Sequence, residues 1–116
     1  MYRVGEFSEM TGLSKDTLRY YAKIELLSPT RIDETNKYSY YDNQAFLTAR
    51  LLVYLRKFDF SIQEMRVVVH ECSLDQLEEI LVKKKAKLVE EIAIIQQTIQ
   101  KIDVFIKEGN EGMNHD

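Results

Sequence analysis

The segment from Leu74 to about Lys107 contains neither proline nor glycine, and its apolar residues recur at spacings of three and four. This spacing is typical of one face of an α-helix, and Ser73 with Gln76 forms a capping-box pattern at its start. We expect Gly109 to end the helix. At about 1.5 Å per residue it would reach roughly 50 Å. Such a helix is too long to pack only on the small domain that precedes it, and it therefore needs a partner.

The apolar positions from Leu88 to Ile106 form a coiled-coil seam, and a four-residue stutter at Lys83–Lys85 interrupts the pattern upstream. The simplest partner is a second copy of the chain, and the alternative is one amphipathic helix lying on its own domain. The seam itself does not decide between parallel and antiparallel pairing. The cluster Lys83–Lys87 is either a solvated face or a contact to acidic residues of the second copy. The expected dimer interface is Leu77, Leu81, Leu88, Ile92, Ile95, Ile99, Ile102 and Ile106.

The segment from Thr11 to Tyr21 predicts a turn followed by a short helix. Gly12 can adopt the backbone angles of a tight turn, and Ser14 is a good N-cap, so the helix should begin at Lys15. The spacing of apolar residues before Thr11 predicts a first short helix. The pair would form a helix-turn-helix whose second helix docks in the major groove of DNA. The alternative is an ordinary helical hairpin with a solvated face.

A small wing and two further helices are expected after this pair. Pro29 blocks helix continuation, and alternating aromatic and polar residues over 38–41 suit a two-stranded wing with Asn36 and Lys37 near its tip. Asp42 can cap a helix over residues 43–58, and Ser61 with Glu64 forms a capping box for the next helix. The apolar contacts expected from the 43–58 helix are Phe46, Leu47, Leu51, Val53, Tyr54 and Leu55.

Six short motifs occur in order along about the first seventy residues: Tyr2-Arg3-Val4-Gly5-Glu6, Thr11-Gly12-Leu13-Ser14, Thr17-Leu18-Arg19-Tyr20-Tyr21, Leu26-Leu27-x-Pro29-x-Arg31, Tyr38-x-Tyr40-Tyr41 and Phe60-Ser61-Ile62-x-Glu64. Together they resemble the DNA-binding domain of the MerR family of bacterial transcription regulators. The resemblance implies an antiparallel homodimer on an inverted-repeat operator, distortion of promoter DNA to activate transcription, and RNA polymerase at the promoter as a further partner.

We expect the DNA contacts to come from the second helix, the wing and the turn after the third helix. Lys15, Asp16 and Thr17 would lie nearest the base edges, and the remaining side chains would hold phosphates or support the contact surface. The full set of expected DNA-binding residues is Arg3, Ser14, Lys15, Asp16, Thr17, Arg19, Tyr20, Lys37, Tyr38, Ser39, Arg56 and Lys57.

The chain departs from the family pattern where that pattern usually has glycine. Glu25, Lys37 and Asp59 occupy three such positions, at which the backbone often adopts positive φ. Ser39 stands where the wing usually has arginine, which removes a phosphate contact that Lys37 at the tip would partly restore. These substitutions affect the wing geometry and the affinity for the operator.

The net charge of −3 is unusual for a DNA-binding protein until it is divided along the chain. Residues 1–70 hold ten basic and nine acidic side chains, whereas residues 71–116 hold six basic and ten acidic ones. The acidity therefore lies mainly in the C-terminal segment, and local charge governs the attraction of phosphates. We expect DNA binding to depend strongly on salt. Its affinity should come from two DNA-binding domains held together in a dimer.

Several classes of site and location are not expected. The single cysteine, Cys72, excludes an internal disulfide and suits the cytoplasm, and no apolar run approaches the length of a membrane span. Cys72 with only His70 nearby falls short of the ligand set of a metal sensor, so no metal or cofactor is expected. No nucleophile, paired-carboxylate or phosphate-loop arrangement appears, and an enzyme is not expected.

Together these patterns predict a mainly all-α fold in three segments. A winged helix-turn-helix domain with a small β wing covers residues 1–71, a long dimerisation helix in an antiparallel coiled coil covers 72–108, and a polar tail without an effector-binding domain covers 109–116. The expected function is a cytoplasmic, sequence-specific transcription regulator that binds an inverted-repeat promoter site as a homodimer and acts by DNA distortion. The alternatives are a coiled-coil protein-interaction module with weakened DNA binding and an architectural DNA-bending protein.

Overall fold

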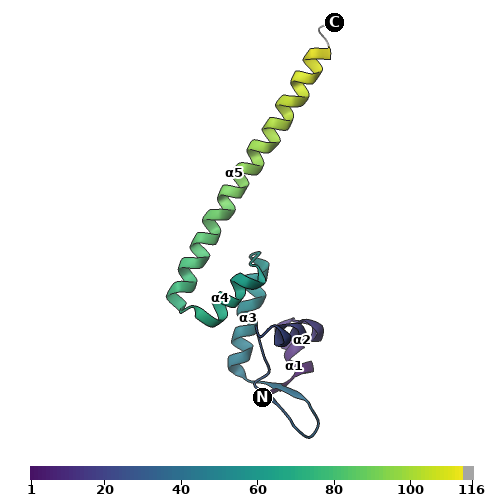
Figure 1. Cartoon of the computed structure of the whole chain (residues 1–116), viewed down its shortest axis with the longest axis vertical. Coiled ribbons are helices and arrows are strands. Elements are labelled where there is room, and N and C mark those ends of the chain that lie inside the picture. The colour runs from purple at the N-terminus through teal and green to yellow at the C-terminus, as the bar shows by residue number, and fades with distance from the viewer. Residues whose placement is uncertain (114–116) are drawn as a thin grey trace. The chain divides into compact units, whose positions relative to one another are not determined.

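The chain is described by a computed structural model over residues 1–113, and it divides into two units, Met1–Cys72 and the segment that begins at Ser73 (Figure 1). The first unit contains strand β1 (Tyr2–Arg3), helices α1 (Val4–Thr11) and α2 (Lys15–Lys23), strands β2 (Arg31–Ile32) and β3 (Ser39–Tyr41), and helices α3 (Asn43–Lys57) and α4 (Ile62–Glu71). The second unit is helix α5 (Leu74–Met113). The predicted winged helix-turn-helix and long C-terminal helix are therefore confirmed as the fold.

Helices α2, α3 and α4 begin at the residues that the sequence predicts. Ser14 caps α2, and Asp42 caps α3 by accepting a hydrogen bond from the backbone N–H of Ala45 at 2.8 Å. Both hydrogen bonds of the capping box are present between Ser61 and Glu64 at the start of α4. Each cap gives an orphan backbone donor of the first turn a partner, which fixes where the helix starts.

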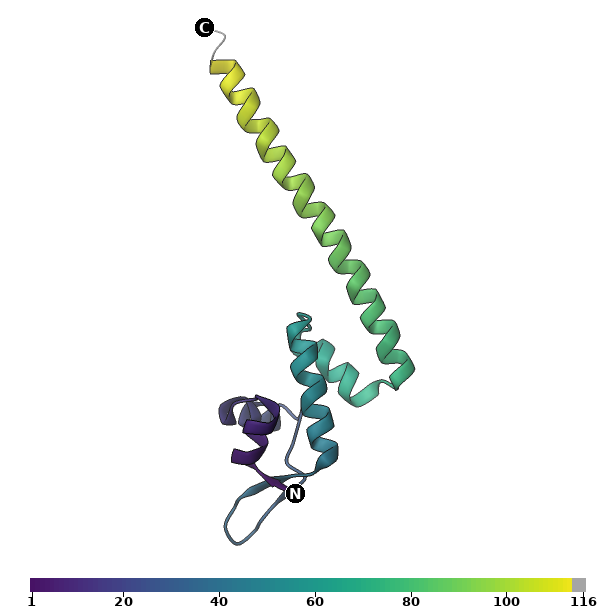
Figure 2. The same ribbon diagram turned by 180° about the vertical axis from the view of Figure 1, so that it is seen from behind.

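The wing belongs to a three-stranded antiparallel sheet in the order β1-β3-β2. Strands β2 and β3 form the predicted hairpin, with Arg31 opposite Tyr40. The sequence did not predict β1, in which Tyr2 lies opposite Tyr41, because a strand of two residues is too short to show an alternating pattern. Within this unit the hairpin loop extends beyond the helices (Figure 2).

The core of the first unit is apolar, and it takes side chains from all four helices, from β3 and from the α2–β2 connection. Its buried residues are Phe7, Leu13, Leu18, Tyr21, Leu26, Leu27, Tyr41, Ala45, Ala49, Leu52, Leu55, Phe60, Met65 and Val68. No polar or charged residue among the described ones is buried with them. The hydrophobic effect therefore holds this small domain together with little contribution from buried polar groups.

The apolar contacts predicted for α3 were partly wrong. Leu47 and Tyr54 are 60% and 47% exposed, whereas Ala45, Ala49 and Leu52 are buried beside the correctly predicted Leu55. The cause lies in the composition of α3, which carries apolar residues around most of its circumference. Periodicity alone cannot select the buried face of such a helix.

Three non-glycine residues of the described chain have positive φ, and they are the three that replace a family glycine. The φ angles are 59° at Glu25, 63° at Lys37 and 65° at Asp59. A side chain in this left-handed region costs about 1–2 kcal/mol relative to glycine. The turn after α2, the wing tip and the turn after α3 therefore carry backbone strain.

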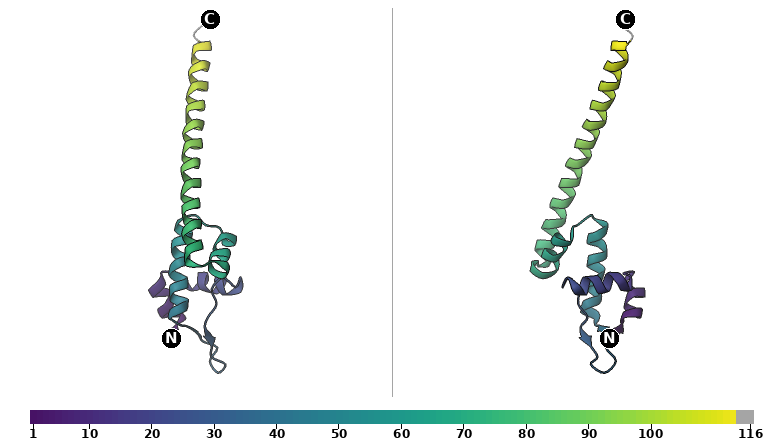
Figure 3. Two further views of the ribbon diagram at one scale, coloured as in Figure 1. Left: turned by 90° about the vertical axis from the view of Figure 1, so that its left-hand side faces the viewer. Right: turned by 45° about the vertical axis from the view of Figure 1, so that its right-hand side comes forward.

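Helix α5 is longer than the sequence predicts. It continues through Gly109 to Met113, so the expectation that Gly109 ends the helix is wrong, and Figure 3 shows one continuous ribbon. A glycine inside a helix costs only about 1 kcal/mol, and that is too little to end a helix by itself. Of the described helices, α5 included, none has both the length and the apolar character that a membrane span requires.

Candidate nucleic-acid interface

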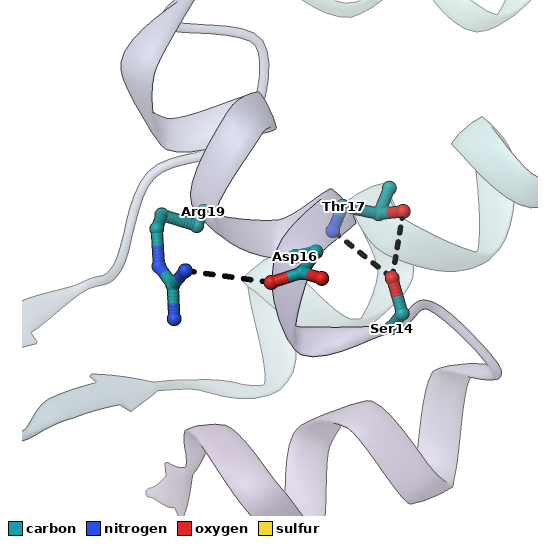
Figure 4. Close-up of polar contacts among 4 residues, drawn as sticks. All are labelled: Ser14, Asp16, Thr17 and Arg19. Atoms are coloured by element: carbon teal, nitrogen blue, oxygen red, sulfur yellow. Dashed lines mark hydrogen bonds and ion pairs between the residues drawn. The ribbon is translucent and has the colours of Figure 1, made fainter.

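The start of α2 is held by a local hydrogen-bond network that leaves its first residues exposed. Gly12 has a φ of 79° and ends α1, and Ser14 then accepts a hydrogen bond from the Thr17 backbone N–H at 3.0 Å (Figure 4). The Ser14 hydroxyl also donates to the Thr17 hydroxyl at 2.9 Å. Lys15 and Asp16 follow the cap and face solvent. The N-terminal end of α2 is thereby oriented and accessible, as a DNA-reading helix requires.

Asp16 and Arg19 form an exposed ion pair one turn apart on α2. The guanidinium lies 3.4 Å from the carboxylate, and the two side chains are 90% and 80% exposed (Figure 4). An ion pair this exposed contributes little stability, about 0–1 kcal/mol. Both groups are therefore available to exchange this contact for one to a base or a phosphate.

The wing tip is a turn held by hydrogen bonds between its side chains and its backbone. The Asp33 carboxylate accepts hydrogen bonds from the backbone N–H groups of Thr35 at 2.8 Å and Asn36 at 3.2 Å. These two donors hold the pKa of Asp33 below its ordinary value of 3.8, so the carboxylate is charged at neutral pH. Asn36 in turn accepts from the Tyr38 backbone N–H at 2.9 Å. Lys37 sits between them in the left-handed region with its side chain exposed.

A cation–π contact joins the N-terminal strand to the wing. The guanidinium carbon of Arg3 in β1 lies 4.2 Å from the ring centroid of Tyr38. Such stacking leaves the edge of the guanidinium free to donate hydrogen bonds. Arg3 and Tyr38, which were predicted separately as phosphate contacts, therefore form one stacked pair.

These elements enclose a groove of about 690 Å³ between α2 and the wing. Four cationic side chains line it, from β1, the start and the middle of α2, and the wing tip: Arg3, Lys15, Arg19 and Lys37. Glu6 is the acidic residue in the same lining, and Tyr38 and Ser39 complete the predicted set there. Six of the expected DNA-binding residues are thus brought together, and the groove is locally basic although the chain as a whole is acidic.

A second hollow, of about 630 Å³, lies between α2 and the turn that joins α3 to α4. Its lining includes Asp16, Thr17 and Tyr20 from α2 and Arg56 from α3. Arg56 is therefore close to the DNA-reading helix. Lys57 does not line this hollow. Its ammonium group lies 5.4 Å from the ring centroid of Tyr54 on the same helix.

Arg31 was not among the predicted DNA-binding residues. It is exposed on β2, and its guanidinium carbon lies 5.2 Å from the ring centroid of Tyr40, its neighbour across the hairpin. The wing thus carries two arginine–tyrosine contacts. No local sequence signal identifies this contact, because it follows from the hairpin register that sets Arg31 opposite Tyr40.

His70 and Cys72 lie near the end of the first unit, in and directly after the last turn of α4. The Nε2 atom of His70 lies 2.8 Å from the carbonyl oxygen of Glu25, which links α4 to the turn after α2. Cys72 is half-buried and follows the end of α4. Among the residues that the structure describes, no three histidine, cysteine or acidic side chains are grouped so that they could hold a metal ion.

Comparison with known proteins relates the chain to DNA-binding regulators. Residues 2–72 match the model of a family described as MerR HTH family regulatory protein. The HTH-type transcriptional activator mta of Bacillus subtilis (strain 168) is 28% identical over 119 residues, which cover 97% of this chain and 44% of that protein. The chain thus spans less than half the length of this curated relative.

Two solved structures share the fold. The cryo-EM structure of the EcmrR–DNA complex in EcmrR-RPo has a TM-score of 0.70 and 23% sequence identity, and the match covers 95% of this chain and 40% of that chain. The crystal structure of MtaN, the N-terminus of the Bacillus subtilis multidrug transporter activator, has a TM-score of 0.58 and 27% identity, and the match covers 85% of this chain and 98% of that chain.

Proposed function

The chain belongs to the MerR HTH family of regulatory proteins, and from this premise we propose that it binds a specific double-stranded DNA site and regulates transcription. The observation that carries the proposal is the basic groove between α2 and the wing, where Arg3, Lys15, Arg19 and Lys37 converge. Phosphate attraction depends on local charge, so an acidic chain can bind DNA through such a face.

The side chains divide into two kinds of contact. Lys15, Asp16 and Thr17 at the start of α2 read base edges, because this end of a recognition helix enters the major groove. The phosphate contacts come from Arg3, Arg19, Tyr20, Lys37, Tyr38, Arg56 and Lys57, and Ser39 lies in the wing beside them. Of this second set, Lys57 is the weaker candidate, since its ammonium lies against the ring of Tyr54. Ser14 acts by holding the helix start in place.

The regulator acts as a homodimer on an inverted repeat. The support is the apolar seam of α5, whose five isoleucines are each more than half exposed: Ile92, Ile95, Ile99, Ile102 and Ile106. A row of exposed apolar residues of this length is a partner surface in folded proteins. Distortion of promoter DNA, RNA polymerase as a further partner and a cytoplasmic location belong to the same proposal, and catalysis has no part in it.

Selection of binding sites from random duplex DNA tests the proposal. The purified chain is incubated with the random library at near-physiological salt, which suppresses nonspecific attraction. Recovery of an inverted repeat is the expected result. Recovery of no motif would refute the regulator and favour a protein-interaction module, and retention of bent DNA with weak sequence preference would favour an architectural protein.

A further inference from the structure

Asp16 is an acidic side chain at the start of α2, the helix whose other proposed DNA contacts are cationic or neutral. It is 90% exposed, and its carboxylate lies 3.4 Å from the guanidinium of Arg19 (Figure 4). It lines the hollow between α2 and the turn after α3, together with the cationic Arg56. A carboxylate on a DNA-binding surface repels the phosphates, so its favourable contact must be with another part of the duplex.

The base edges of the major groove offer a carboxylate few partners. A carboxylate only accepts hydrogen bonds, and the donors on these edges are the amino groups of cytosine and adenine. Guanine and thymine present acceptor atoms there, which repel a carboxylate. Adenine carries the acceptor N7 beside its amino group, whereas cytosine has no acceptor of its own beside N4. Cytosine is therefore the base that fits a carboxylate best.

We propose that Asp16 is a specificity-determining residue whose carboxylate accepts a hydrogen bond from the N4 amino group of a cytosine in each half of the inverted repeat. The inference rests on the proposed function and names the base that this position selects. In the free protein the carboxylate lies against Arg19, and an ion pair this exposed is easily exchanged. On docking, the guanidinium turns to a phosphate and the carboxylate to the base, so that one exchange supplies two contacts.

The carboxylate of Asp16 also acts against incorrect sequences. Against guanine or thymine it meets an acceptor atom, and in a nonspecific complex it lies near phosphates without a donor. Specificity is a difference of affinities, and a repulsive group contributes to it as well as an attractive one. Asp16 therefore weakens binding to random DNA more than binding to the operator.

Exchange of the carboxylate for an amide tests the proposal, because the asparagine side chain pairs with N6 and N7 of adenine in the major groove. Binding sites are selected from random duplex DNA with the wild-type chain and with Asp16→Asn. The two motifs are expected to differ at one position in each half of the repeat, where adenine replaces cytosine. Dissociation constants are then measured on both operators. Wild type should prefer the cytosine operator by about tenfold, and Asp16→Asn should prefer the adenine operator.

Glu6→Gln is the matched control, because it makes the same change of charge in the lining of the basic groove but on α1. It should leave the selected motif unchanged. Both variants should bind random DNA more tightly than wild type, since each removes a negative charge from the DNA-binding surface. Asp16→Ala has neither donor nor acceptor on its side chain, and it is expected to accept all four bases at the position that Asp16→Asn changes.

Two results would overturn the inference while the proposed function stands. One is a wild-type motif that Asp16→Asn leaves unchanged. The other is an equal change in the affinity of Asp16→Asn for all sequences, which would mean that Asp16 acts only by positioning Arg19. If the wild-type chain recovers no motif, the proposed function fails, and the inference fails with it.

Discussion

The rings of Phe7 in α1 and Tyr41 in β3 stack face to face, with centroids 4.2 Å apart and planes 8° from parallel. Both side chains are buried. Phe7 belongs to the helix-turn-helix and Tyr41 to the central strand of the wing sheet, so the stack couples the two elements that line the basic groove. The geometry of the groove therefore depends on an apolar contact beneath it.

Replacement of Phe7 by leucine should lower the free energy of unfolding of the chain by about 1–2 kcal/mol. The substitution keeps an apolar side chain but removes the ring stacking, which contributes about 0.5–1.5 kcal/mol beyond burial, and it leaves the core imperfectly filled. Chemical denaturation measures the change. Phe58→Leu is the matched control, because Phe58 is also in an aromatic pair but is exposed, and it should change stability by less than about 0.5 kcal/mol.

Tyr41 should make the protein less stable at alkaline pH. Burial raises the pKa of Tyr41 above its ordinary value of 10.0, so the unfolded chain loses this proton more readily than the folded one. The stabilisation that comes from burying the protonated Tyr41 hydroxyl is fully present below pH 10. It is lost as the pH rises from 10 toward the raised pKa of Tyr41 in the folded protein. Tyr41→Phe should weaken this decline and leave the pH 7 value within about 0.5 kcal/mol. Denaturation curves across pH 8–11 check it, and an unchanged alkaline slope would contradict the assignment.

Glu25→Gly should stabilise the chain by roughly 0.5–1 kcal/mol. The substitution relieves the strain at φ 59°, and the greater entropy of glycine in the unfolded state offsets part of the gain. Glu25→Ala is the control, because it removes the carboxylate but keeps Cβ and the strain. The two variants are compared by thermal or chemical denaturation. Equal stability of both variants would show that the carboxylate, and not the backbone, is responsible.

The wing-tip residue Lys37 allows backbone and charge to be separated. Lys37→Gly should raise stability, whereas Lys37→Ala should not, because only glycine relieves the φ of 63°. Both variants should bind DNA more weakly, and each should lower the slope of log affinity against log salt by about 1, the effect of one lost phosphate contact. Salt titrations on the selected operator measure this. An unchanged slope in both variants would remove Lys37 from the contact set.

Lys15 and Arg19 should differ in their effect on specificity. Lys15→Ala should change which base is preferred at one operator position and cost about 1–3 kcal/mol there, because a base contact discriminates among sequences. Arg19→Ala should instead weaken binding to all sequences alike. Binding to the operator, to its single-base variants and to random DNA distinguishes the two. Equal losses for Lys15→Ala on specific and random DNA would contradict its role in base reading.

The local features of the fold could be predicted from sequence because short-range chemistry determines them. The caps at Ser14, Asp42 and Ser61 each depend on a few neighbouring residues. The positive φ at Glu25 and Lys37 was expected from the family resemblance alone. Features that depend on long-range packing could not be predicted in the same way. The two-residue strand β1 forms only because β3 lies beside it, and the buried face of α3 is chosen by the helices that it meets.

The same distinction applies to the candidate site. The types of its residues were evident from the motifs, but the stacking of Arg3 on Tyr38 joins residues 35 positions apart. Arg31 was missed because its contact with Tyr40 depends on the hairpin register. The order of these residues in space follows from the sheet, which the local sequence does not encode.

The hydrogen bonds that the Asp33 and Asn36 side chains accept from backbone N–H groups of the wing have a kinetic consequence. The tip is already ordered in the free protein, so contact with DNA does not have to organise it. Association is then governed by diffusion and electrostatic steering toward the duplex, and the lifetime of the complex is set by the contacts made after docking.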